Sequence, residues 1–146
     1  MLKQFLAKEC VHLDAEAKSP EEAIRLAGLL LVKAGKVKPS YVDAMVEGFQ
    51  TFGPYIVVAP SIAIPHARPE HGVLETCVSF IRLKKPIPFH HPANDPVQLI
   101  FSIGGGDPES HLILLQSLAS LLGIPQHVEE LKKVRSYEEL VHLLDD

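Results

Sequence analysis

The first third of the chain carries apolar residues at helical spacing. They recur every three or four positions, as on one face of a helix: Ala23, Ile24, Ala27, Leu30, Leu31 and Ala34. Residues 19–22 (SPEE) precede this run as a capping box with proline at the first helical position, and Gly35 follows it. The pattern predicts a helix over 19–35. The same spacing from Val42 to Phe49 predicts a second helix over 40–53.

The middle of the chain changes to β-branched and apolar runs between prolines. Residues 55–59 (YIVVA), 76–83 and 97–103 (VQLIFSI) predict three strands. The last of them is almost continuously apolar, which is typical of a strand buried in the centre of a sheet. Residues 84–96 contain four prolines and are expected to form a loop.

The last third is again helical. Residues 104–110 (GGGDPES) form a turn and helix-start signal, and apolar spacing then predicts a helix over 108–122. Shorter helices are expected over 125–133 and over 136–144, the latter opened by a second capping box. Helices on both sides of a run of strands, with no linker or repeat, predict one three-layer α/β domain over 1–146.

Composition narrows the class of protein. The length of 146 residues fits one domain, and 18 acidic against 14 basic residues give a net charge of −4 without a basic cluster, so no nucleic-acid partner is expected. Cys10 and Cys77 show no paired spacing and are expected to be reduced, structural thiols. No signal peptide or apolar run of the ~20 residues that a membrane span needs is visible. We therefore expect a soluble, cytoplasmic protein.

Eight histidines are the compositional anomaly. The sequence contains neither an H-E-x-x-H nor a C-x-x-C motif, so no metal site is expected. A metal-dependent hydrolase using His66, His71 and His111 is kept as an alternative. The glycine-rich residues 104–110 lack the G-K-[ST] ending of an ATP-binding loop, and no G-x-S-x-G motif offers a nucleophilic serine. No cofactor is expected.

Two histidines lie where an anion could be bound. Prolines at 60, 65 and 69 stiffen the segment that displays His66, and Arg68 is a planar donor suited to phosphate oxygens. His111 falls in the first turn of the helix after the glycines, where free N–H groups favour an anion. These residues suggest phosphoryl transfer through a histidine. The alternative is a loop histidine beside a surface arginine, with His111 solvated at a helix start.

The segment 53–73 (GPYIVVAPSIAIPHARPEHGV) resembles the phosphohistidine region of enzyme IIA components of bacterial sugar phosphotransferase systems. The resemblance is to the mannitol/fructose structural class, and within it the ascorbate-type subgroup is the most similar. It extends to residues 92–97, 110–112 and 136–140, and so covers nearly the whole chain. It implies the mannitol-type enzyme IIA fold, a mixed β-sheet with helices on both faces.

The resemblance also implies a role for each matching residue. His66 would accept a phosphoryl group from the phosphorylated histidine carrier protein and pass it to a cysteine of enzyme IIB, which feeds a membrane permease. His111 matches the second active-site histidine, which stabilises that group. Mannitol- and fructose-type members usually carry an arginine after the second helix, and residues 48–52 hold none. Our hypothesis is that Arg68 replaces it, and the substrate is then expected to be ascorbate or a related acidic sugar.

Two questions stay open at this point. A regulatory phosphotransferase domain that signals its phosphorylation state to a protein partner would keep the same histidine. A transient partner contact would need an apolar patch near His66, for which Ile62, Ile64 and Val73 are candidates, although all three could equally belong to the core.

Overall fold

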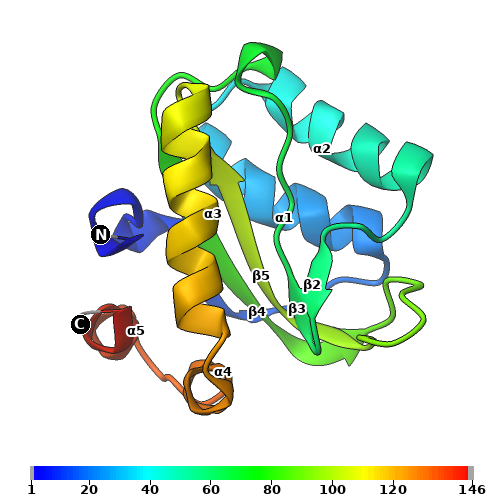
Figure 1. Ribbon diagram of the computed structural model, residues 1–146, viewed down its shortest axis with the longest axis vertical. Helices are drawn as coiled ribbons and strands as arrows, with labels where there is room; N and C mark the ends of the chain where they lie inside the picture. Colours follow the sequence, from blue (N-terminus) through cyan, green and yellow to red (C-terminus); the bar gives the residue numbers. More distant parts are fainter. Residues whose placement is uncertain (1, 145–146) are drawn as a thin grey trace.

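The computed structural model describes residues 2–144, in which a mixed β-sheet lies between two layers of helices (Figure 1). The strands are β1 (Val11–Ala15), β2 (Val57–Ala59), β3 (Ile62–Ala63), β4 (Cys77–Ile87) and β5 (Val97–Gly104). The α-helices are α1 (Pro20–Lys33), α2 (Pro39–Phe52), α3 (Pro108–Leu122), α4 (Pro125–Leu131) and α5 (Tyr137–Leu144). Short 3-10 helices are η1 (Leu2–Phe5), η2 (Lys8–Cys10) and η3 (Pro69–His71).

The sheet has the strand order β1-β4-β5-β3-β2. Strands β1 and β4 pair in parallel, as do β3 and β5, whereas the β4–β5 and β2–β3 pairs are antiparallel. Helices α1 and α2 lie on one side of the sheet and α3 on the other, with α4 and α5 following α3 (Figure 1). The predicted three-layer α/β/α arrangement with a mixed sheet is confirmed.

The helices begin where the capping signals predict. Three side chains, those of Ser19, Asp107 and Ser136, accept hydrogen bonds from the backbone N–H groups of Glu22, Ser110 and Glu139 at 3.1, 2.7 and 3.1 Å. These bonds satisfy N–H groups that have no partner within the helix. The predicted start of the second helix at Ser40 is wrong by one residue, because α2 begins at Pro39 and the Ser40 hydroxyl donates to the His71 carbonyl at 2.8 Å instead.

The strands depart more from the prediction. The strand expected over 55–59 is confined to Val57–Ala59, and β4 runs on to Ile87, into the expected loop 84–96. Strands β1 and β3 were not predicted. β1 lies at the edge of the sheet, and most of its side chains are partly or fully exposed to solvent. β3 is only two residues long. Both strands are therefore defined by pairing with a neighbouring strand and not by their own sequence pattern. The β-propensity of individual residues is a weak guide to strands whose formation depends on cross-strand pairing.

The two cysteines behave as the sequence predicts. Cys10 and Cys77 are free and buried. Burial raises the pKa of the Cys77 thiol to about 12, so this side chain is a neutral part of the core at physiological pH.

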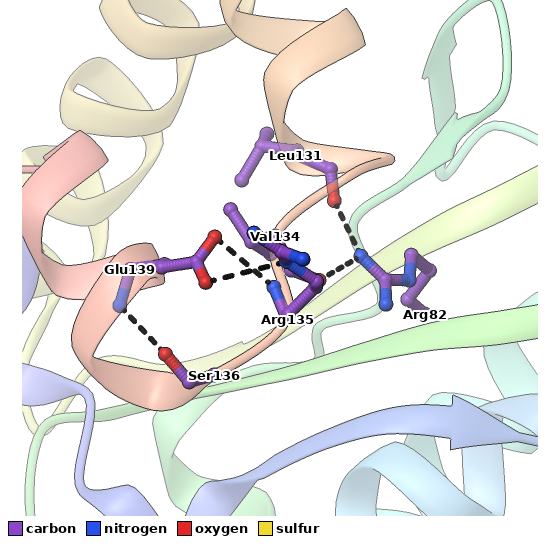
Figure 2. Close-up of polar contacts among 6 residues, drawn as sticks. All are labelled: Arg82, Leu131, Val134, Arg135, Ser136 and Glu139. Atoms are coloured by element: carbon purple, nitrogen blue, oxygen red, sulfur yellow. Dashed lines mark hydrogen bonds and ion pairs between the residues drawn. The ribbon is translucent and has the colours of Figure 1, made fainter.

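Arg82 on β4 ties the C-terminal helices to the sheet. Its Nε donates to the Leu13 carbonyl of β1 at 3.2 Å, and its Nη1 donates to the carbonyls of Leu131 and Val134 at 3.1 and 2.6 Å. Figure 2 shows the guanidinium directed at the chain that leaves α4. Carbonyls at a helix C-terminus have no partner within the helix, so this half-buried guanidinium is well placed there.

We predict that Arg82→Met lowers the free energy of unfolding by about 2–4 kcal/mol, because charged hydrogen bonds are lost and carbonyls are left without partners. The matched control is Arg135→Met. Arg135 and Glu139 form an ion pair at 3.7 Å in which the arginine side chain is 87% exposed (Figure 2), and such pairs contribute about 0–1 kcal/mol. Urea unfolding at pH 7 measures both, and equal small losses would contradict the role of Arg82.

Candidate functional site

Parallel pairing of β3 with β5 brings the two candidate histidines together. Ile62 lies opposite Leu99 and Ala63 opposite Ile100, so the carboxyl ends of both strands meet at one edge of the sheet. His66 lies three residues after the end of β3, and His111 lies in the first turns of α3, which follows β5. Their ring centroids are 5.3 Å apart.

The hydrogen bond of His66 fixes its tautomer. Its Nδ1 lies 2.7 Å from the Ile64 carbonyl oxygen. A carbonyl can only accept, so Nδ1 carries the ring proton and Nε2 keeps its lone pair. His66 is half-buried. His66 therefore offers Nε2 as a positioned nucleophile.

Tyr41 of α2 holds the backbone on both sides of this site. Its hydroxyl donates to the Ile103 carbonyl of β5 at 2.6 Å and accepts from the backbone N–H of Ala67 at 3.0 Å. Burial raises the pKa of Tyr41, so the group stays a neutral hydroxyl. No sequence pattern indicated this role, because a buried aromatic residue on a helix is indistinguishable from an ordinary core residue.

The glycine-rich turn fixes His111. A Cβ at Gly105 would lie 2.5 Å from the backbone N and Cα of His111, so only glycine allows this close approach. The Gly106 N–H donates to Thr76 Oγ1 at 3.0 Å, which holds the turn against the start of β4. Nδ1 of His111 is buried and has no hydrogen-bond partner among residues 2–144. Burial, and secondarily the neighbouring His66, lower the pKa of His111.

His66 and His111 both line a cavity of about 570 Å³. Its lining includes His66, Arg68, Tyr55, His71 and His111. The Arg68 side chain is exposed and forms no ion pair with any residue in the described range 2–144. A free guanidinium, two imidazoles and the N-terminal end of α3 make this cavity suitable for a tetrahedral oxyanion.

The structure decides between patch and core for the three apolar candidates near His66. Ile62 and Ile64 are core residues at 0% and 4% exposure, so they form no patch around His66, and Val73 is only half-buried. The exposed apolar side chains at the cavity are Phe52 and Tyr55, at 74% and 47%. Phe52 ends α2, and Tyr55 lies in the turn that follows, outside the strand that was expected over 55–59.

His71 does lie at the same cavity as the two other histidines. Among the described residues, however, no three His, Cys, Asp or Glu side chains are arranged to hold a metal ion. The alternative of a metal-dependent hydrolase built on His66, His71 and His111 therefore has no ligand set in this structure.

The fold and the paired histidines define an anion site on a mixed α/β sheet, as expected of a phosphoryl carrier. The chain belongs to the family of the phosphoenolpyruvate-dependent sugar phosphotransferase system, EIIA 2, whose model matches residues 4–146. It is thus a phosphotransferase component, and the family predicted from the sequence is confirmed.

Named relatives agree with this assignment. An ascorbate-specific PTS system EIIA component of Escherichia coli is 36% identical over 146 residues, covering 99% of this chain and 95% of that protein. The solution structure of the mannitol-specific cryptic enzyme IIA CmtB from Escherichia coli superposes with a TM-score of 0.87 at 30% identity, covering 98% and 97% of the two chains. A complex of mannitol enzyme IIA with phosphorylated enzyme IIB, from the same organism, gives 0.84 at 32% identity, covering 94% and 95%. The mannitol-type enzyme IIA fold is confirmed.

The lowered pKa of His111 predicts a pH dependence of stability. In the unfolded chain its pKa returns to about 6.5, so the unfolded state binds more protons in mildly acidic solution. The contribution of His111 is fully present above pH 6.5 and is lost as the pH falls through the folded-state pKa. We expect His111→Gln to lose less stability than the wild type between pH 7.5 and 5.5, measured by urea unfolding, a range set around the ~6.5 of a free histidine. Parallel pH profiles would contradict this.

Proposed function

We propose that the chain is a phosphocarrier in which His66 is the phosphorylated residue. The observation that carries the proposal is the bond from His66 Nδ1 to the Ile64 carbonyl, since it leaves Nε2 free at a cavity that also holds Arg68 and His111. The donor is the phosphorylated histidine carrier protein, and the acceptor is a cysteine of enzyme IIB. Similarity to an enzyme IIA bound to phosphorylated enzyme IIB supports this direction of transfer.

The transfer step follows from the positions of these groups. The Nε2 lone pair of His66 attacks phosphorus, and the bond from phosphorus to the donor's imidazole nitrogen breaks, returning its electron pair to that ring. Arg68, His111 and the N-terminal end of α3 balance the charge spread over the phosphoryl oxygens. In the second step the enzyme IIB thiolate attacks phosphorus and the electron pair returns to Nε2. The Nδ1 proton stays on His66 throughout.

We further propose ascorbate or a related acidic sugar as the transported substrate. The ascorbate-specific name of relatives at 36% and 37% identity supports this, as does the absence of arginine from residues 48–52. Transport is favoured over a purely regulatory role by the same relatives. No helix within residues 2–144 is long and apolar enough to cross a membrane. Because the chain belongs to the EIIA 2 family, we propose that it acts in the cytoplasm and serves a separate permease through enzyme IIB.

The first test is intact-mass analysis after incubation with phosphoenolpyruvate, enzyme I and the histidine carrier protein. We expect one acid-labile phosphoryl group on the wild type and none on His66→Ala. His71→Ala is the matched control, because His71 lines the same cavity and is expected to leave the mass gain intact. A phosphorylated His66→Ala variant, or an unphosphorylated wild type beside active upstream proteins, would overturn the assignment.

The second test addresses the acceptor. Phosphorylated chain is mixed with ascorbate-type or mannitol-type enzyme IIB, and loss of phosphohistidine is followed by rapid quench. We expect transfer to the ascorbate-type protein to be at least about tenfold faster, a difference of ~1.4 kcal/mol in activation free energy. Equal rates, or faster transfer to the mannitol-type protein, would overturn the substrate assignment and leave phosphorylation of His66 unaffected.

A further inference from the structure

A row of rings leads from the surface to the phosphoryl site. Phe52 and Tyr55 are in edge contact with centroids 6.3 Å apart, and Tyr55 contacts His66 edge-on at 5.8 Å with an interplanar angle of 86°. His66 in turn lies against His111. Tyr55 is therefore the side chain that packs on the nucleophilic imidazole from the side of α2.

The position of the Tyr55 hydroxyl is set by a glycine. A Cβ added at Gly48 of α2 would lie 3.1 Å from the Tyr55 oxygen, tighter than ordinary van der Waals contact. Gly48 lines the same cavity as His66 and His111, so the hydroxyl lies at the wall of that cavity. Glycine inside a helix is unfavourable relative to alanine. Its presence here leaves room for the hydroxyl.

The Tyr55 hydroxyl also lacks a partner. Among the hydrogen bonds of residues 2–144, none involves it, whereas the hydroxyls of Tyr41 and Tyr137 both donate to backbone carbonyls. Burial raises the pKa of Tyr55, so the group is a neutral donor at physiological pH. The Tyr55 hydroxyl, a hydrogen-bond donor without a partner beside His66, is therefore available to an acceptor oxygen on an incoming phosphoryl group.

We propose that Tyr55 is a catalytic residue whose hydroxyl donates a hydrogen bond to an oxygen of the phosphoryl group on His66, while its ring restrains the imidazole. This inference rests on the proposed phosphorylation of His66. The donor is neutral and lies on the α2 side of the cavity, where residues 48–52 supply no cation. Tyr55 and Arg68 would then contact different oxygens of the same group.

Tyr55→Phe is the direct test, because it keeps the ring contact and removes only the hydroxyl. We expect phosphorylation of His66 by the histidine carrier protein to slow by about tenfold at saturating donor, since one preorganised donor to a transferring group is lost. The ³¹P resonance of the phosphohistidine should shift, while the ¹⁵N signals of unphosphorylated His66 stay as in the wild type. Tyr137→Phe is the matched control, because it removes a tyrosine hydroxyl that donates to the Leu6 carbonyl outside this cavity, and it should leave both readouts unchanged.

Gly48→Ala supplies a second and independent variant. The added methyl group should displace the Tyr55 hydroxyl while favouring the helix, so a slower transfer without loss of thermal stability would support the proposal. A wild-type rate and an unshifted ³¹P resonance in Tyr55→Phe would overturn it, with His66 phosphorylation itself intact. If the wild type takes up no phosphoryl group, this inference and the proposed function both fail.

Discussion

The buried hydroxyl of Tyr41 is the constraint on which the site depends. The parallel pairing of β3 and β5 places the chain before His66 beside the chain before the glycine-rich turn, and Tyr41 then joins Ala67 to Ile103 across that edge. Leaving either buried backbone group without a partner costs about 1–3 kcal/mol. Because His66 is next to Ala67, this bridge holds the backbone that carries the imidazole against β5, together with the bond from the Ile103 N–H to the Pro65 carbonyl at 3.1 Å.

The charge of the cavity differs from that of the chain as a whole. The chain carries a net charge of −4, yet the cavity presents the guanidinium of Arg68 and the N-terminal end of α3 beside two imidazoles. Burial lowers the pKa of His111, which avoids two adjacent imidazolium rings while the cavity holds no anion. A dianionic group on His66 would act on His111 in the opposite direction. Before loading, the site therefore carries little positive charge beyond the Arg68 guanidinium, and a phosphoryl group on His66 would favour protonation of His111.

The features that could be predicted from the sequence are those in which a residue type has one well-defined local structural role. The caps at Ser19, Asp107 and Ser136 are of this kind. Prediction from the sequence failed where pairing across the chain decides, as in β3, whose two residues have no pattern of their own. That failure also explains why Ile62 and Ile64 were considered as surface candidates, since their burial comes from β2, β5 and the backbone bond of Ile64 to Ile56. The roles of Tyr41 and Tyr55 depend on contacts between distant segments and had no sequence signal.

The bond between His66 Nδ1 and the Ile64 carbonyl has a consequence for repeated turnover. A free imidazole that lost a phosphoryl group could return in either tautomer, and one of the two would carry its proton on the nitrogen that must attack next. In the proposed transfer, the Ile64 carbonyl would retain the proton at Nδ1 while Nε2 gains and loses the phosphoryl group. Each cycle therefore ends with the ring in the form in which it began, and no proton has to be exchanged with water before the carrier can be loaded again.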